Sequence, residues 1–154
     1  MKRIARIIIY LIFYVGIMVN SSFGEDVKLP NAAGAFYPNN AQELSNKIDS
    51  VIVKANPQAM PGEIFALISP HAGYDFSAGV AAYGYKLIKG KNYKTVVVIG
   101  PSHFFGFAGI SVYSTGKFYT PLGAVEIDEE FTDKLIGKNK SVFFEPQAFA
   151  KEHS

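Results

Sequence analysis

Two short apolar runs on either side of a helical segment constrain the fold more than any other feature of this sequence. Residues 64–68 (IFALI) and 95–99 (TVVVI) are too short and too continuously apolar for surface helices, which is typical of strands buried in a parallel sheet. Between them, residues 77–88 have the small and late apolar residues of a packed helix, and Gly90 follows as its stop. This order predicts a βαβ unit with parallel strands and a right-handed crossover.

A histidine stands just beyond each predicted strand. His71 follows Pro70, and His103 follows Pro101 with one serine between them. Proline cannot donate the next ladder hydrogen bond, so each strand should end abruptly there. Ligands of open α/β sheets bind beyond the carboxyl ends of the strands, and imidazole both binds transition metals and transfers protons near neutral pH. If the strands are neighbours, or one strand apart, we expect the two imidazoles to converge.

Two further helices and several strands complete the pattern. Asn40 and Asp128 are predicted N-caps of helices that end near Pro57 and at Gly137. The other strand-like segments are residues 109–114, 117–120, 124–127 and 141–144. The first two of these flank Gly116, which favours a hairpin or meander at that point. We therefore expect an α/β fold, a three-layer α/β/α arrangement with a central mixed sheet.

The N-terminal segment has the three parts of a secretory signal peptide. Basic residues in positions 2–6 precede an apolar run over residues 7–19, and small or polar residues lead up to Gly24. The apolar run is shorter than the roughly 20 residues that span a bilayer. We expect cleavage after Gly24, a signal peptide over 1–24, a domain over 25–154 and a periplasmic or extracellular location. An uncleaved N-terminal anchor, with membrane contact through that segment alone, is the alternative.

Composition limits the chemistry and the partners. The chain has 154 residues, of which 49% are hydrophobic and 18% charged, as in a single globular domain. The formal net charge of +2 includes the basic start, so the remainder is nearly neutral and nucleic acid is not an expected partner. The chain has no cysteine, which excludes disulfides, thiolate metal ligands and a cysteine nucleophile within it.

Five ordered motifs carry a resemblance to a known family. They are Gly-Ala-Phe-Tyr-Pro at 34–38, Pro-His-Ala-Gly-Tyr at 70–74, Gly-Pro-Ser-His at 100–103, Tyr-Thr-Pro-Leu-Gly at 119–123 and Glu-His-Ser at 152–154. Together they resemble the Memo family, whose bacterial and archaeal members are called AmmeMemoRadiSam system protein B. The family's fold is similar to that of class III extradiol dioxygenases, which use non-haem iron. Five motifs in the same order are far more specific than any one of them.

The resemblance implies a site. His71 and His103 match histidines that line the family's cleft and serve as metal ligands, with iron or copper as the metal and no organic cofactor. His153 lies near the cleft and is a further candidate ligand. Tyr74 and Ser102 would be cleft neighbours that hydrogen-bond a ligand or orient an imidazole. Catalytic residues stay unassigned.

Three positions also have simpler interpretations. His153 could be a solvated residue near the end of the chain, and Asp75 favours hydrogen bonding to nearby backbone over positioning a ligand. The phenylalanines at 104, 105 and 107 favour packing in a core or at a cleft rim. Phe104 also departs from a common family pattern, in which a second histidine follows the first.

The resemblance further implies that family members are considerably longer, with an aspartate and a histidine downstream that complete the metal site. We therefore expect this chain to be the N-terminal part of a family member, with the missing C-terminal half as its partner and an incomplete sheet. Two histidines alone make a poor site for iron or copper. Two functions stay open: a metal-dependent redox or dioxygenase-like enzyme in its full-length form, and a non-catalytic module that binds a peptide or small molecule.

Overall fold

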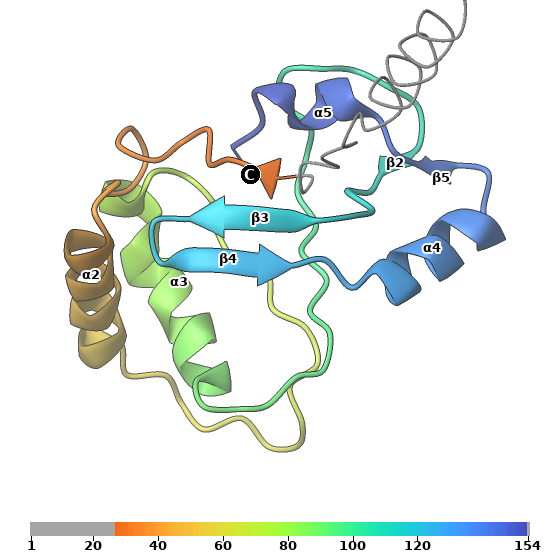
Figure 1. Cartoon of the computed structure of the whole chain (residues 1–154). Helices are drawn as coiled ribbons and strands as arrows, with labels where there is room; N and C mark the ends of the chain where they lie inside the picture. Colours follow the sequence, from red (N-terminus) through yellow and green to blue (C-terminus); the bar gives the residue numbers. More distant parts are fainter. Residues whose placement is uncertain (1–26, 154) are drawn as a thin grey trace, which may run out of the picture.

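The computed structural model describes residues 27–153 and contains both helices and strands (Figure 1). In chain order the elements are β1 (Val27–Lys28), α2 (Ala41–Lys54), α3 (Tyr74–Ile88), β2 (Ile110–Ser111), β3 (Lys117–Thr120), β4 (Gly123–Glu126), α4 (Glu129–Lys138), β5 (Val142–Phe143) and α5 (Pro146–Ala150). The predicted signal peptide and its cleavage point after Gly24 lie outside the described residues. Within the described range, no helix is both long enough and apolar enough to cross a membrane.

The strands form a mixed sheet and a separate parallel pair. In the three-stranded sheet the order is β1-β3-β4, with β1 parallel to β3 and β3 antiparallel to β4. β2 pairs with β5 in parallel. The predicted α/β class with a mixed sheet is confirmed.

The predicted hairpin exists, but its turn is not where the sequence pattern placed it. The chain reverses at Pro121-Leu122 between β3 and β4, and not around Gly116. The hydroxyl of Thr120 closes this turn, because it accepts a hydrogen bond from the Leu122 backbone N–H at 3.1 Å and donates to the Gly123 carbonyl at 3.1 Å. Gly123 has φ +128°, a conformation that side chains disfavour. The segment over 109–114 pairs through β2 with β5 instead, 31 residues or more along the chain.

Helices α2 and α3 lie side by side and share a cluster of buried apolar residues (Figure 1). The predicted cap of α2 is confirmed, since the Asn40 side chain accepts from the Glu43 backbone N–H at 3.1 Å. Ile52 and Ala55 pack with Ala82 of α3. Lys86 of α3 donates to the Ala55 carbonyl at 2.6 Å, which places a positive charge at the negative end of the α2 dipole.

The two buried strands predicted around α3 are wrong. Residues 64–68 and 95–99 form no strand ladder among the described residues, and their side chains are largely exposed, with Phe65 at 95% and Val98 at 85%. The helix between them is confirmed, although it begins at Tyr74 and not at residue 77. The apolar pattern predicts that these segments favour burial. A buried parallel strand also needs a neighbouring strand that supplies hydrogen bonds and other elements packed on both of its faces. Within residues 27–153 these two segments have no paired strand, and most of their residues are exposed.

Helix α4 begins as predicted and ends one residue later than predicted. The Asp128 carboxylate accepts from the Phe131 backbone N–H at 3.0 Å, and the helix runs through Gly137 to Lys138. Asp128 also accepts a hydrogen bond from the Thr95 hydroxyl at 2.5 Å, which ties the extended 95–99 segment to the start of α4. The hydrogen bond from Thr95, followed by that from Phe131, lowers the pKa of the Asp128 carboxyl.

Candidate functional site

His71 and His103 lie face to edge across two loops. Their ring centroids are 5.4 Å apart and their planes meet at 60°. His71 precedes α3, and its loop is held in place by two hydrogen bonds: the Tyr74 backbone N–H donates to the Phe36 carbonyl at 2.7 Å, and the buried Ser77 hydroxyl donates to the Ala72 carbonyl at 2.6 Å. The structure therefore brings the two imidazoles together, as expected for a shared site, without the two strands that were predicted to place them.

His153 joins this pair from the far end of the described chain. Its ring stacks on His103 with centroids 4.3 Å apart and planes 22° apart. Its edge meets Phe36 at 4.7 Å between centroids and Phe104 at 5.5 Å. His153 is thus packed among aromatic rings and is not a solvated tail residue.

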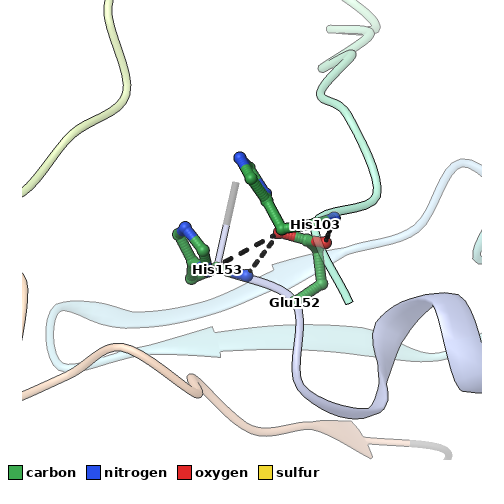
Figure 2. Close-up of side chains that lie close together, drawn as sticks. All are labelled: His103, Glu152 and His153. Atoms are coloured by element: carbon green, nitrogen blue, oxygen red, sulfur yellow. Dashed lines mark hydrogen bonds and ion pairs between the residues drawn. The ribbon is translucent and has the colours of Figure 1, made fainter. Parts of the chain in front are cut away.

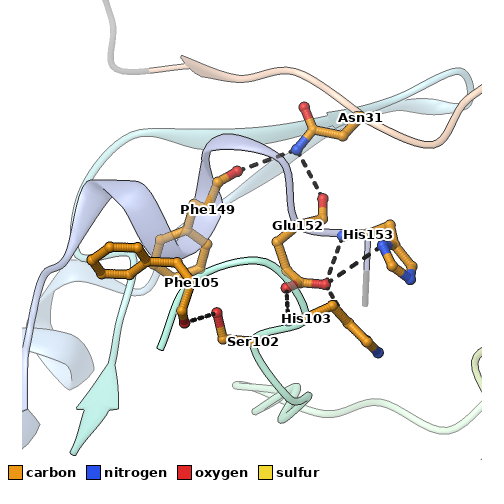
Figure 3. A network of polar contacts seen from close by, with 7 residues as sticks. All are labelled: Asn31, Ser102, His103, Phe105, Phe149, Glu152 and His153. Carbon is orange, nitrogen blue, oxygen red and sulfur yellow. Dashed lines mark hydrogen bonds and ion pairs between the residues drawn. The ribbon is translucent and has the colours of Figure 1, made fainter. Parts of the chain in front are cut away.

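Helix α5, which the sequence patterns did not predict, delivers the segment that carries His153. An aromatic cluster anchors the helix through Phe149. The centroid of its ring lies 5.3 Å from that of Tyr113, 6.1 Å from that of Phe144 and 6.3 Å from that of Phe118 in β3. The side-chain amide of Asn31 then donates to the Phe149 carbonyl at 3.2 Å and to the Glu152 carbonyl at 2.8 Å (Figure 3). The hydrogen bonds to both carbonyls place the end of the described chain beside His103.

Glu152 makes the densest set of polar contacts at the site (Figure 2). Its Oε2 accepts from the His103 backbone N–H at 2.6 Å, and its Oε1 lies 2.7 Å from Nδ1 of the same residue. The His153 backbone N–H also donates to Oε1 at 2.8 Å. The Glu152 side chain is 10% exposed, whereas the His103 side chain is 32% exposed.

An open depression of about 520 Å³ lies over the three histidines. Its lining residues are Phe36, Pro70, His71, Ala72, Gly73, His103 and His153. Apart from the imidazoles, these side chains are apolar or absent. The depression therefore offers ring nitrogens as its polar side-chain groups within an otherwise apolar surface, which is the general character of ligand sites in proteins.

Tyr74 and Ser102 lie beside the histidines but do not line this depression. Tyr74 faces a neighbouring hollow and contacts Tyr37 at 5.4 Å between ring centroids, and burial raises the pKa of its hydroxyl. The Ser102 hydroxyl donates to the Phe105 carbonyl at 2.7 Å and so shapes the loop that carries His103 (Figure 3). Asp75 forms an ion pair with Lys47 of α2. The expected ligand contacts of Tyr74 and Ser102 stay predictions.

The donor set suits a transition metal. One ligand atom from each of His103, Glu152 and His153 lies within 4.8 Å of the others, and His71 faces His103 from the opposite loop. Imidazole nitrogen with a carboxylate nearby is the donor chemistry that iron, copper and zinc favour in proteins. These residues therefore fit a metal ion by donor type.

Comparison with known proteins identifies the family. The model of the family described as Memo-like protein matches residues 28–154, which is most of the chain. The chain belongs to the Memo family. A MEMO1 family protein of Nitrosopumilus maritimus is 35% identical over 83% of this chain and 48% of its own length. A MEMO1 family protein of Pyrobaculum aerophilum is 37% identical over 83% of this chain and 48% of its own length.

A less similar relative is also considerably longer than this chain. The protein memo-1 homolog of Caenorhabditis elegans is 30% identical over 87% of this chain and 38% of its own length. The chain thus spans about half the length, or less, of these curated Memo relatives.

The sequence patterns assign no role to two residues of the candidate site. Glu152 stands out in the sequence only as part of the Glu-His-Ser motif, although an acidic residue beside a candidate ligand is a signal for a histidine partner. Phe36 belongs to the Gly-Ala-Phe-Tyr-Pro motif, which assigns it no role, yet its ring contacts His153 and lines the depression. Neither partner could be named from the sequence, because both contacts join segments far apart along the chain.

Proposed function

We propose that this Memo family chain supplies a histidine-lined metal site, in which His71 and His103 hold an iron or copper ion. The observation that carries the proposal is the convergence of the two imidazoles at a centroid distance of 5.4 Å beside an apolar-lined depression. His153, stacked on His103, is the third candidate ligand. In the complete family domain, further ligands from the other half would finish the coordination sphere.

We further propose that the complete domain carries out redox or dioxygenase-like chemistry. An iron or copper ion supplies one-electron chemistry and open coordination positions for substrate or oxygen. The residues of this chain bind and orient: the imidazoles provide neutral nitrogen donors, and the rings of Phe36 and Phe104 exclude water from one side of His153. No nucleophile with an adjacent base is assigned among them.

Metal content tests this proposal. The purified chain is loaded with iron(II) without oxygen, or with copper(II), dialysed and analysed for bound metal. We expect weak loading of the unsubstituted chain, since its ligand set is only part of that of the complete domain, and loss of this loading in the His71→Ala/His103→Ala variant. Gln42→Ala, on the exposed side of α2, is the control and should load normally. Equal metal content in the double variant and the control would rule the proposal out.

The second candidate is a non-catalytic module that binds a peptide or small molecule in the same depression. The apolar lining contributed by Phe36, Pro70 and Ala72 favours it. Stoichiometric binding of a ligand that survives a strong chelator would support this candidate over the metal site. Binding that disappears with the chelator would support the metal site.

We also propose that the chain is exported, with the segment before Glu25 serving as its signal peptide. Sequencing of the N-terminus of the exported product should begin at Glu25. An intact N-terminus at Met1 on a membrane-bound product would support the anchor alternative instead.

A further inference from the structure

A single carboxylate holds His103 at two points. Oε2 of Glu152 accepts from the His103 backbone N–H at 2.6 Å, while Oε1 lies 2.7 Å from Nδ1 of the His103 ring. The two contacts fix both the backbone and the ring of one residue, so the imidazole has little freedom to rotate about its side-chain bonds. The partners are 49 residues apart in the sequence.

The contact at Nδ1 determines which ring nitrogen carries the proton. An ionised carboxylate can only accept hydrogen bonds, so a bond of 2.7 Å to Nδ1 requires a proton on Nδ1. In a neutral imidazole the other nitrogen, Nε2, then carries a free lone pair. The tip of the ring points away from Glu152 in both close-up views (Figures 2 and 3). That lone pair is what a metal ion or a proton donor would meet.

Two other roles for Glu152 explain the contacts less well. As a metal ligand, it would offer the ion oxygens that already accept hydrogen bonds from the His103 and His153 backbones, and this role leaves the 2.7 Å contact with Nδ1 of His103 unexplained. As a simple anchor for the end of the described chain, its carboxylate would duplicate a task already performed by Asn31, which binds the Glu152 carbonyl, and by the aromatic cluster around Phe149. Neither role accounts for the ring contact.

We propose that Glu152 is a positioning residue that holds His103 in the Nδ1-protonated form and leaves Nε2 available on the side away from Glu152. Carboxylate partners of this kind orient metal-binding histidines and raise their basicity. The role of Nε2 as a metal ligand rests on the proposed metal site. The position of the proton on Nδ1 does not depend on a metal, so the metal site and the positioning role of Glu152 can be tested separately.

The first measurement is the ¹⁵N spectrum of the histidine side chains in the metal-free chain, at a pH where the imidazoles are neutral. We expect a directly bonded proton on Nδ1 of His103 and none on Nε2. Glu152→Ala should abolish this preference. Glu152→Gln keeps an acceptor oxygen and should restore it in part, whereas a purely structural role would leave the protonation pattern unchanged in both variants. Glu130→Gln on α4, an exposed site with the same loss of charge, is the matched control and should match the unsubstituted chain.

The second measurement is the affinity for copper(II), titrated alone. Loss of a carboxylate partner typically weakens metal binding by roughly 10–100-fold, so we expect a loss of that size in Glu152→Ala and little change in Glu130→Gln. Should the unsubstituted chain bind no copper and no iron, yet show the Glu152-dependent proton on Nδ1, the metal site fails and the positioning role stands.

The converse outcome is equally clear. A proton on Nε2 of His103 in the unsubstituted chain overturns the positioning role, even if metal binds. This measurement of the protonated nitrogen needs no variant, so the proposal remains testable if Glu152→Ala does not fold. An unchanged protonation pattern in a folded Glu152→Ala variant overturns it as well.

Discussion

The side-chain amide of Asn31 donates a hydrogen bond to the Glu152 carbonyl at 2.8 Å, although 121 residues separate the two. The same amide reaches the Phe149 carbonyl at 3.2 Å. The segment that follows β1 thereby holds the segment that follows α5. The position of Glu152 and His153 against His103 depends on this link.

Removal of the Asn31 amide should loosen the site. Asn31→Asp keeps the shape but cannot donate, and we expect it to lower the free energy of unfolding by about 1 kcal/mol, since the two lost bonds are exposed to water. Urea unfolding measures the stability, and the ring contact of His153 with His103 is followed by NMR. Gln42→Ala serves again as the control. A stable Asn31→Asp variant with unchanged histidine resonances would contradict the role given to this link.

Gly109 should resist replacement because two constraints meet there. Its φ is +120°, and a Cβ at that position would lie 2.5 Å from the Ser141 carbonyl oxygen and 2.9 Å from the ring of Phe143. Ser141 accepts the hydrogen bond from the Ile110 backbone N–H that starts the β2–β5 pairing. We expect Gly109→Ala to destabilise the fold by roughly 1–3 kcal/mol, measured by urea unfolding.

The matched control for Gly109 is Gly79, in the interior of α3. It has ordinary helical backbone, and a Cβ there would meet no atom within 4 Å. Gly79→Ala should therefore stabilise the chain by about 0.4–1 kcal/mol through the loss of unfolded-state entropy. If both alanine variants shift stability in the same direction, the account of Gly109 is wrong.

Asp128 should contribute a pH-dependent part of the stability. The hydrogen bonds from Thr95 and from the Phe131 backbone lower the pKa of its carboxyl below the ordinary value of 3.8. A lowered folded-state pKa adds stability that is present above the unfolded-state pKa and is lost as the pH falls through the folded-state pKa. The difference in urea midpoint between the unsubstituted chain and Asp128→Asn should therefore be constant near neutral pH and shrink below about pH 4.

The control for Asp128 is Asp133→Asn, at an exposed position on the same helix. Asp133 caps no helix among the described residues, so this variant should change the urea midpoint at neutral pH less than Asp128→Asn does. An Asp128→Asn difference that stays constant down to pH 2 would argue against the carboxylate as its source.

The exposed apolar segments should make this chain associate when it is produced alone. Phe65 and Val98 belong to runs that predict burial, yet both are open to solvent in the described structure. We propose that the other half of a complete Memo domain covers them. Phe65→Lys/Val98→Lys should raise the monomer fraction in light scattering without loss of stability, whereas Val53→Lys, at an isolated exposed position on α2, should not. A monodisperse monomer of the unsubstituted chain would contradict this prediction.

The starts of α2 and α4 and the family could be predicted from the sequence because their determinants are local. Asn40 and Asp128 each accept from a backbone N–H three residues ahead, so the cap and its partner lie within one turn. The ordered motifs around His71 and His103 also indicated the Memo family before any geometry was known. Apolar periodicity and motif order indicate helices and family without any knowledge of which distant residues contact one another.

Tertiary structure alone decided the pairing of the strands and the partner of His103. The segments 64–68 and 95–99 have the composition of buried strands, but a strand forms only where another strand supplies ladder hydrogen bonds, and no strand among the described residues pairs with them. Glu152 reaches His103 across 49 residues because α5 and the Asn31 link place it there. A sequence pattern states what a segment favours, and the folded chain decides which distant group meets it.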